Sequence, residues 1–120
     1  MSLIVFDFDG VMTDNRVWVD QDGREMVAAN RSDSLGTELL KKHTPIGLFV
    51  LSKETNTVVA ARCRKMKIPV LQAVDDKPAA LSKLFSERGI DAAKVIYMGN
   101  DLNDLPCFPL VGCAVAPSDA

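Results

Sequence analysis

Three short apolar runs, each followed at once by polar residues, constrain the fold of this chain most. Residues 3–6 end at Asp7, residues 46–51 end at Ser52, and residues 95–98 lead into Gly99. Segments with helical periodicity separate the runs, and this alternation predicts an α/β fold with a parallel sheet. Because ligands of such sheets bind at the carboxyl ends of the strands, the polar residues are expected to share one site.

The remaining elements are predicted from turn and helix signals. A β-hairpin is expected at residues 16–29, because Asp22 and Gly23 form the dipeptide favoured in tight turns. Ser32 or Ser34 is the expected cap of a helix that runs to about residue 42. Helical spacing also predicts helices at residues 56–67, 77–88 and 103–108, with further strands at residues 69–71 and 113–116.

Length and composition favour one domain over residues 1–120. The chain has 48% hydrophobic residues, a net charge of −2 and a pI near 5.3, so nothing indicates nucleic-acid binding. No apolar stretch approaches the roughly 20 residues of a membrane helix. The chain enters a strand at once, so no cleavable signal peptide is expected. The three cysteines are odd in number and lack CxxC spacing, which fits a cytoplasmic protein.

Asp7 and Asp9 are the first candidate functional residues. Side chains alternate along a strand, so the two carboxylates are expected to point the same way. Two carboxylates at the end of a strand are suited to hold Mg²⁺ against a phosphate. Taken alone, the pair could also be an acidic turn after a core strand.

Four motifs in order give the chain a family resemblance. They are Asp-Phe-Asp-Gly-Val-Met-Thr-Asp at residues 7–14, Ser52, Lys77, and Gly-Asn-Asp at residues 99–101. This set covers nearly the whole chain and resembles the haloacid dehalogenase superfamily of phosphotransferases. The expected fold is therefore a Rossmann-like parallel sheet of order 3-2-1-4-5. Helices would cover both faces, and a short hairpin flap would stand in place of a cap domain.

The resemblance implies a role for each of four residues. Asp7 would be the nucleophile that forms an aspartyl-phosphate, and Asp9 the general acid and base, with its backbone carbonyl on Mg²⁺. Ser52 and Lys77 would hold the phosphoryl oxygens. Each of these last two has an alternative role: Ser52 could cap a helix, and Lys77 could be a solvated charge at a helix start.

The acidic loop departs from the family pattern. The superfamily commonly has an acid directly after the glycine, whereas this chain has Asn100, and the acid follows at Asp101. Mg²⁺ would be bound by Asp7, by Asp9 and by either of these two residues. Asp104 would orient Lys77 or the loop.

Within the superfamily the chain resembles the capless branch, because only the hairpin fills the first cap position. That branch includes octulosonate 8-phosphate phosphatases, nine-carbon sugar-acid 9-phosphate phosphatases, and the phosphatase-like domain of CMP-sialic acid synthetases. Glu54 follows the nine-carbon pattern, with Arg62 and Lys65 at the spacing of substrate-facing basic residues. These could instead form a solvated charged face. Ser32 and Asp33 match the substrate-side loop, or simply cap the helix.

Two functions are expected from this resemblance. The first is an Mg²⁺-dependent phosphatase acting on a small sugar-acid phosphate, with nine carbons favoured over eight. The second is a weakly active or non-catalytic oligomerisation domain associated with a CMP-sialic acid synthetase. Capless relatives form homotetramers through the hairpin, where Trp18 could contact a neighbour or fold back. Relatives continue beyond the last strand, so a trimmed domain is expected.

Overall fold

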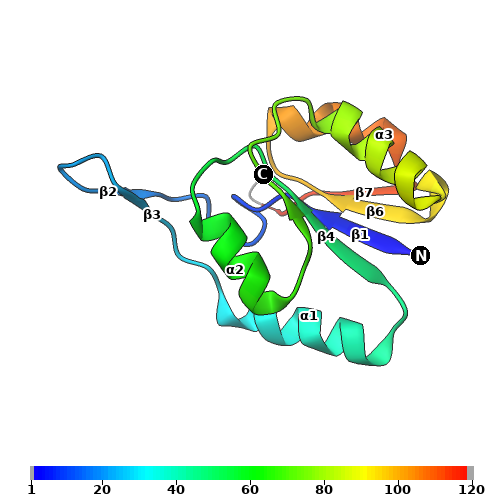
Figure 1. Ribbon diagram of the computed structural model, residues 1–120, viewed down its shortest axis with the longest axis horizontal. Coiled ribbons are helices and arrows are strands. Elements are labelled where there is room, and N and C mark those ends of the chain that lie inside the picture. Colours follow the sequence, from blue (N-terminus) through cyan, green and yellow to red (C-terminus); the bar gives the residue numbers. More distant parts are fainter. Residues whose placement is uncertain (1, 119–120) are drawn as a thin grey trace.

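A five-stranded parallel sheet forms the centre of the computed structural model, which describes residues 2–118. Along the chain the sheet strands are β1 (Leu3–Phe6), β4 (Gly47–Leu51), β5 (Val70–Leu71), β6 (Val95–Met98) and β7 (Cys113–Val115). Their order in the sheet is β5-β4-β1-β6-β7 (Figure 1). Numbered among the sheet strands alone this is 3-2-1-4-5, so the predicted topology is confirmed.

Helices cover both faces of the sheet, as predicted. Helices α1 (Arg31–His43) and α2 (Val58–Met66) lie on one side, and α3 (Lys77–Arg88) lies on the other (Figure 1). The 3-10 helix η2 (Leu102–Leu110) packs against α3. A short 3-10 helix, η1 (Ala92–Lys94), was not predicted, since three residues carry no periodicity.

Strand alternation divides the core into two layers. In β4, Phe49 and Leu51 join the cluster under α3, whereas Leu48 and Val50 join the cluster under α2. Both faces of this strand are therefore buried, as expected for a central parallel strand. The same alternation sends Val5 of β1 toward α3, and Asp7, two residues later, is also buried.

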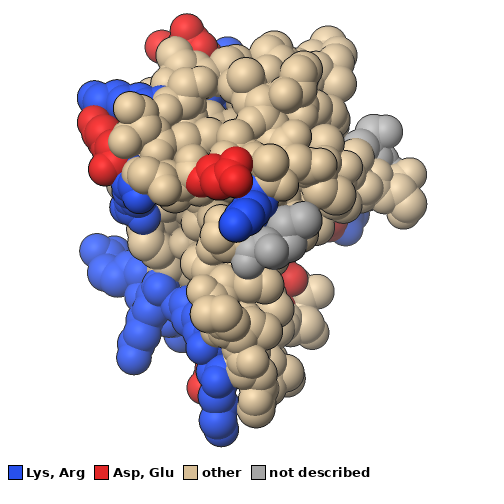
Figure 2. All heavy atoms as spheres, turned by 90° about the vertical axis from the view of Figure 1, so that its right-hand side faces the viewer, with Lys and Arg blue, Asp and Glu red and all other residues tan. Residues whose placement is uncertain are grey.

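The start of α1 corrects the predicted cap. Asn30 is the N-cap, and its side chain accepts a hydrogen bond from the Ser32 backbone N–H at 2.9 Å. Ser32 and Ser34 instead lie inside the first turn, so neither caps the helix. Asparagine is as good a cap as serine, so Asn30 can begin the helix earlier than predicted. The last turns of α1 and α2 contain basic residues. Figure 2 shows lysine and arginine side chains gathered in the lower part of one face of the molecule.

The predicted hairpin is present but its strands are short. Strands β2 (Trp18–Val19) and β3 (Glu25–Met26) pair antiparallel and project from the body of the molecule (Figure 1). Gly23 has a φ of +79°, which the turn requires and glycine adopts easily. Trp18 is 66% exposed and Met26 61% exposed, so these side chains do not fold back onto their own domain. Within residues 2–118, no helix combines the length and the apolarity of a membrane span.

Candidate active site

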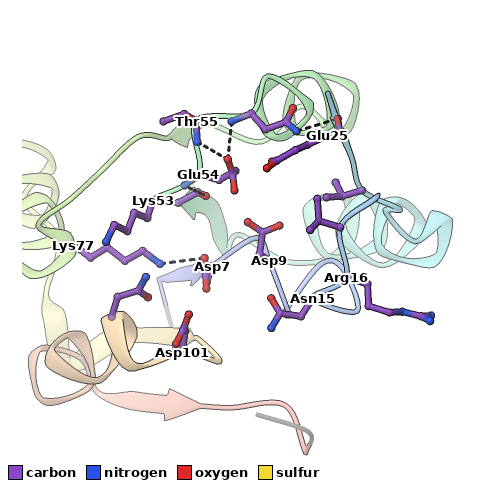
Figure 3. A pocket seen from close by; sticks show the side chains of 15 residues that line it. Asp7, Asp9, Asn15, Arg16, Glu25, Lys53, Glu54, Thr55, Lys77 and Asp101 are labelled. Atoms are coloured by element: carbon purple, nitrogen blue, oxygen red, sulfur yellow. Dashed lines mark hydrogen bonds and ion pairs between the residues drawn. The ribbon is translucent and has the colours of Figure 1, made fainter. Parts of the chain in front are cut away.

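A cavity of about 400 Å³ lies beside the carboxyl ends of β1 and β4. Figure 3 shows Asp7, Asp9, Glu54, Lys77 and Asp101 around it. Ser52 lines it as well. Six residues predicted to act in one site therefore meet at one cavity, although they come from four separate parts of the chain.

Asp7 lies at the inner end of this cavity, directly after β1. Its backbone N–H donates to the Met98 carbonyl at 2.9 Å, which fixes the residue to the end of β6. The carboxylate Oδ1 accepts from the Phe8 backbone N–H at 2.7 Å and lies 3.1 Å from Lys77 Nζ. Burial raises the pKa of Asp7 to about 7, an effect that Lys77 opposes and Asp104 reinforces.

Lys77 is the buried cation of the site. It is only 2% exposed, and its Nζ donates to Asp104 Oδ1 at 2.8 Å as well as contacting Asp7. The alternative of a solvated charge is therefore wrong. Helix α3 begins at Lys77 and is capped by Asp76, whose side chain accepts from the Ala79 backbone N–H at 3.1 Å. This cap fixes the first turn that carries the lysine.

Asp104 connects the lysine to the acidic loop, and it is fully buried. Its Oδ1 accepts from Lys77 and from the Tyr97 hydroxyl, the latter at 2.5 Å. Its Oδ2 accepts from the backbone N–H groups of Asn100 and Asp101 at 3.1 and 3.3 Å. Asp104 therefore orients both the lysine and the loop. The sequence had left open which of the two it would orient.

Ser52 follows β4 and is 1% exposed. The alternative that it caps a helix is wrong, because α2 begins at Val58 with Thr57 as its N-cap. The Ser52 backbone N–H donates to the Leu71 carbonyl at 2.9 Å, while its Oγ accepts from the Glu54 N–H at 3.1 Å. The hydroxyl proton is thus free to be donated into the cavity.

Asp9 lies farther out and is half-buried. Strand alternation is not why it faces the same cavity as Asp7, because β1 ends at Phe6 and residues 9–12 form a turn. Burial raises the pKa of Asp9, and the negative charges of Glu54 and Glu25 raise it further. Glu25 comes from the hairpin and closes one side of the cavity (Figure 3).

The loop after β6 contains the residues that were expected to bind a metal, Asn100 and Asp101. The described residues hold no group of three or more His, Cys, Asp or Glu side chains suited to a metal ion. Asn100, however, has a buried Oδ1 without a hydrogen-bond partner, and such an oxygen is a suitable Mg²⁺ ligand. A Cβ on Gly10 would lie 1.8 Å from Asn100 Nδ2, so only glycine lets this amide approach the Asp7–Asp9 turn. The residues present therefore fit a divalent cation.

Asp101 faces the same cavity but has a structural role as well. Its Oδ1 accepts from the Leu102 N–H at 2.6 Å, and with Asp104 it forms a capping box at the start of η2. This capping role limits how Asp101 could contact a metal, either directly or through water.

Four predicted substrate residues lie elsewhere in the single chain. Ser32 and Asp33 line separate hollows beside α1, not the cavity around Asp7. The Arg62 side chain donates to the Asn30 carbonyl at 3.1 Å and to Ser34 Oγ at 2.6 Å, which ties α2 to α1. Lys65 is exposed on α2. Neither Arg62 nor Lys65 therefore lines the cavity around Asp7.

Sequence reasoning missed several residues of the site. Lys53 and Glu25 line the cavity, and Tyr97 supports it from below. Lys53 directly follows Ser52, so its position was a signal that could have been used. The hairpin places Glu25 by its projection toward the 54–56 loop, where Asn56 Nδ2 donates to the Glu25 carbonyl at 3.4 Å. No local pattern predicts that contact.

Comparisons with known proteins agree with this geometry. A crystal structure of a HAD family hydrolase from Streptomyces avermitilis superposes with a TM-score of 0.95 at 51% identity, over 100% of this chain and 68% of that one. Another is 3-deoxy-D-manno-octulosonate 8-phosphate phosphatase from Moraxella catarrhalis, crystallised with a magnesium ion, a phosphate ion and a KDO molecule. Its TM-score is 0.92 at 28% identity, over 100% of this chain and 69% of that one.

The curated relatives include a cytidylyltransferase. N-acylneuraminate cytidylyltransferase A of Danio rerio is 31% identical over 124 residues, which is 100% of this chain but 28% of the relative. The first curated relatives are longer, and the chain spans between 28% and 64% of their length. The family model of haloacid dehalogenase-like hydrolases matches residues 50–120. With its parallel sheet and its strand-end site, the chain belongs to the haloacid dehalogenase-like hydrolase family.

Proposed function

We propose that the protein is an Mg²⁺-dependent phosphatase that hydrolyses a sugar-acid phosphate through an aspartyl-phosphate on Asp7. The observation that carries the proposal is the buried contact between Asp7 and Lys77, with Ser52 and Asp9 at the same cavity. A carboxylate beside a fixed cation, at the end of a parallel strand, is suited to attack phosphorus. The similarity to a phosphatase crystallised with magnesium and phosphate supports the same chemistry.

Each residue then has a defined task. Asp7 Oδ1 accepts from the Phe8 backbone N–H and contacts Lys77, so we assign Oδ2 as the attacking oxygen. Lys77 and the Ser52 hydroxyl hold the phosphoryl oxygens, since this reaction depends on positioning and charge neutralisation. The raised pKa of Asp9 favours a carboxyl that protonates the leaving oxygen and then accepts a proton from water.

The divalent cation would be held by Asp7, the Asp9 carbonyl and Asn100, with Asp101 reaching it directly or through water. It supplies positive charge to the phosphoryl group and to the Asp7 carboxylate. That charge favours ionised Asp7, which burial alone disfavours.

The substrate class is proposed from the outer part of the cavity. Glu54 lines the cavity, and its match to the nine-carbon branch supports a nine-carbon substrate. Its Oε1 accepts from the backbone N–H groups of Thr55 and Asn56 at 2.9 and 3.0 Å. Those bonds fix the carboxylate. Its second oxygen can accept a hydrogen bond from a hydroxyl group of the substrate.

We also propose that the protein assembles as a homotetramer through the hairpin. Val17, Trp18, Val19 and Met26 are each more than half exposed on one small projection, and such a patch favours a protein partner. A Trp18→Ser variant that remains the same oligomer as the wild type in light scattering would argue against this interface. The expected result is dissociation to smaller species.

The second candidate function is a domain without catalysis, attached to or working beside a CMP-sialic acid synthetase. Its support is the similarity to the cytidylyltransferase and the amide at position 100. The test is phosphate release from a panel of eight- and nine-carbon sugar-acid phosphates with saturating Mg²⁺. Release from a nine-carbon substrate is the expected result. No release from the panel or from a generic aryl phosphate would favour the second candidate.

A further inference from the structure

A buried tyrosine below the cavity has a hydroxyl that the proposed chemistry does not use. Tyr97 is the only tyrosine of the chain, lies in β6 and is fully buried in the core cluster under α3. A phenylalanine would fill nearly the same space, so packing does not account for the hydroxyl. A buried hydroxyl destabilises a fold unless it is hydrogen-bonded, which indicates that its partner matters.

That partner connects the tyrosine to the proposed nucleophile. The Tyr97 hydroxyl donates to Asp104 Oδ1 at 2.5 Å, and the same oxygen accepts from Lys77 Nζ at 2.8 Å. Lys77 Nζ is in turn 3.1 Å from Asp7 Oδ1. The four side chains form a continuous buried row from the core to the cavity.

The charges along this row explain why a neutral donor is useful. Two carboxylates share one ammonium group, and Asp104 is closer to it than Asp7 is. A hydroxyl on Asp104 Oδ1 satisfies part of the hydrogen-bonding capacity of that oxygen and so weakens its hold on Lys77. Burial and the Asp104 charge raise the pKa of Tyr97 far above its ordinary value, so the hydroxyl keeps its proton and remains a donor.

We infer that Tyr97 is a positioning residue, whose hydroxyl holds Asp104 so that Lys77 stays within reach of Asp7 and of the phosphoryl group. The inference rests on the proposed phosphatase function and adds a residue to it. Without the hydroxyl, Asp104 would draw Lys77 toward itself and away from the reacting group. The loss would fall on the transition state more than on substrate binding.

The kinetic test compares Tyr97→Phe with a packing control, Phe108→Leu. The Tyr97 and Phe108 rings meet edge to face with centroids 6.0 Å apart, so Phe108→Leu disturbs the same packing and leaves the hydroxyl in place. With an aryl phosphate and Mg²⁺, Tyr97→Phe is expected to lower kcat about tenfold and to change KM less than about threefold. Phe108→Leu should keep kcat per folded molecule. An unchanged kcat in Tyr97→Phe, or equal losses in both variants, would overturn the inference.

A spectroscopic test needs no turnover. Because the chain has one tyrosine, tyrosine labelled with carbon-13 at Cζ, the carbon that carries the hydroxyl, gives a single resonance in the NMR spectrum. Lys77→Met is expected to shift that resonance, whereas Lys83→Met, an exposed change on the same helix, should not. Equal spectra for Lys77→Met and the wild type would overturn the coupling. If the wild type lacked phosphatase activity, only the proposed function would be overturned. The coupling between Tyr97 and Lys77 would still be tested by the shift of this resonance.

Discussion

The inner and outer halves of the cavity are built differently. In the inner half, Asp7, Lys77 and Asp104 are buried, and each charged group has a partner of opposite charge within 3.1 Å. In the outer half, Glu25 and Lys53 are exposed and Glu54 is partly exposed. The difference teaches that buried ion pairs within one chain hold the groups of the proposed chemistry, whereas the rim, where we propose that selectivity is set, is more exposed to solvent.

The largest expected effect comes from the inner half. Asp7→Asn removes the attacking oxygen charge, so phosphatase activity should fall by several orders of magnitude while the fold is kept. Steady-state phosphate release with Mg²⁺ measures the loss, and thermal melting checks folding. Glu25→Gln at the rim is the matched control and should cost far less. Comparable losses for both variants would remove the distinction between the two halves.

The rim is tested by Glu54→Arg. A positive charge at this position is expected to shift the ratio of kcat/KM between nine-carbon and eight-carbon acid phosphates by about tenfold toward the eight-carbon substrates. Glu54→Arg removes a charge that raises the pKa of Asp9, but an aryl phosphate with a good leaving group needs little help from a general acid, so its release should stay within a few fold. A constant ratio for the two substrate classes would mean that Glu54 does not contact the distinguishing end.

The proposed metal contact of the loop after β6 is tested by Asn100→Asp. Replacing a neutral amide oxygen by a carboxylate should tighten Mg²⁺ binding by several fold and raise turnover at low Mg²⁺. Calorimetric titration of the wild type and the variant measures the affinity. Equal or weaker binding would show that Asp101 already supplies the charged ligand.

The smallest effect concerns stability in the absence of metal. The pKa of Asp7 rises from 3.8 to about 7 on folding, so its protonated form is favoured in the fold. The contribution of Asp7 to the free energy of unfolding is greatest below pH 3.8 and falls as pH rises toward 7. Asp7→Asn lacks this loss and should be more stable than the wild type at pH 8 in chelator, by on the order of 1–3 kcal/mol. Urea unfolding that shows a less stable variant would contradict the burial effect.

Several residues of the site could be predicted from the sequence because each follows a strand or starts a helix. They are residues 7–9, Ser52, Lys77 and the acidic loop. The parallel order then brings these ends to one edge of the sheet. The alternating apolar runs were equally informative for the sheet itself. Local patterns thus placed these residues at strand ends or at a helix start, whereas the family resemblance was needed to choose the proposed roles of Ser52 and Lys77 over their structural alternatives.

The residues that could not be predicted depend on contacts between distant segments. Arg62 has the helical spacing of a cavity residue, yet its hydrogen bonds to the start of α1 hold it there. Glu25 reaches the cavity only because the hairpin projects toward the 54–56 loop. The Tyr97 hydroxyl has no sequence signal, since an aromatic residue in a buried strand is ordinary. Periodicity indicates which face of a helix or strand is buried. It does not indicate which side chains of other segments contact that face.

The most direct test of the central claim is to trap the covalent intermediate. An aryl phosphate with a good leaving group needs no general acid, so Asp9→Asn should form the aspartyl-phosphate but hydrolyse it slowly. After acid quenching, peptide mass spectrometry should find one phosphate on Asp7 in Asp9→Asn, and none in the Asp7→Asn, Asp9→Asn double variant. Phosphate release without a label on Asp7, or a label that survives Asp7→Asn, would contradict the account.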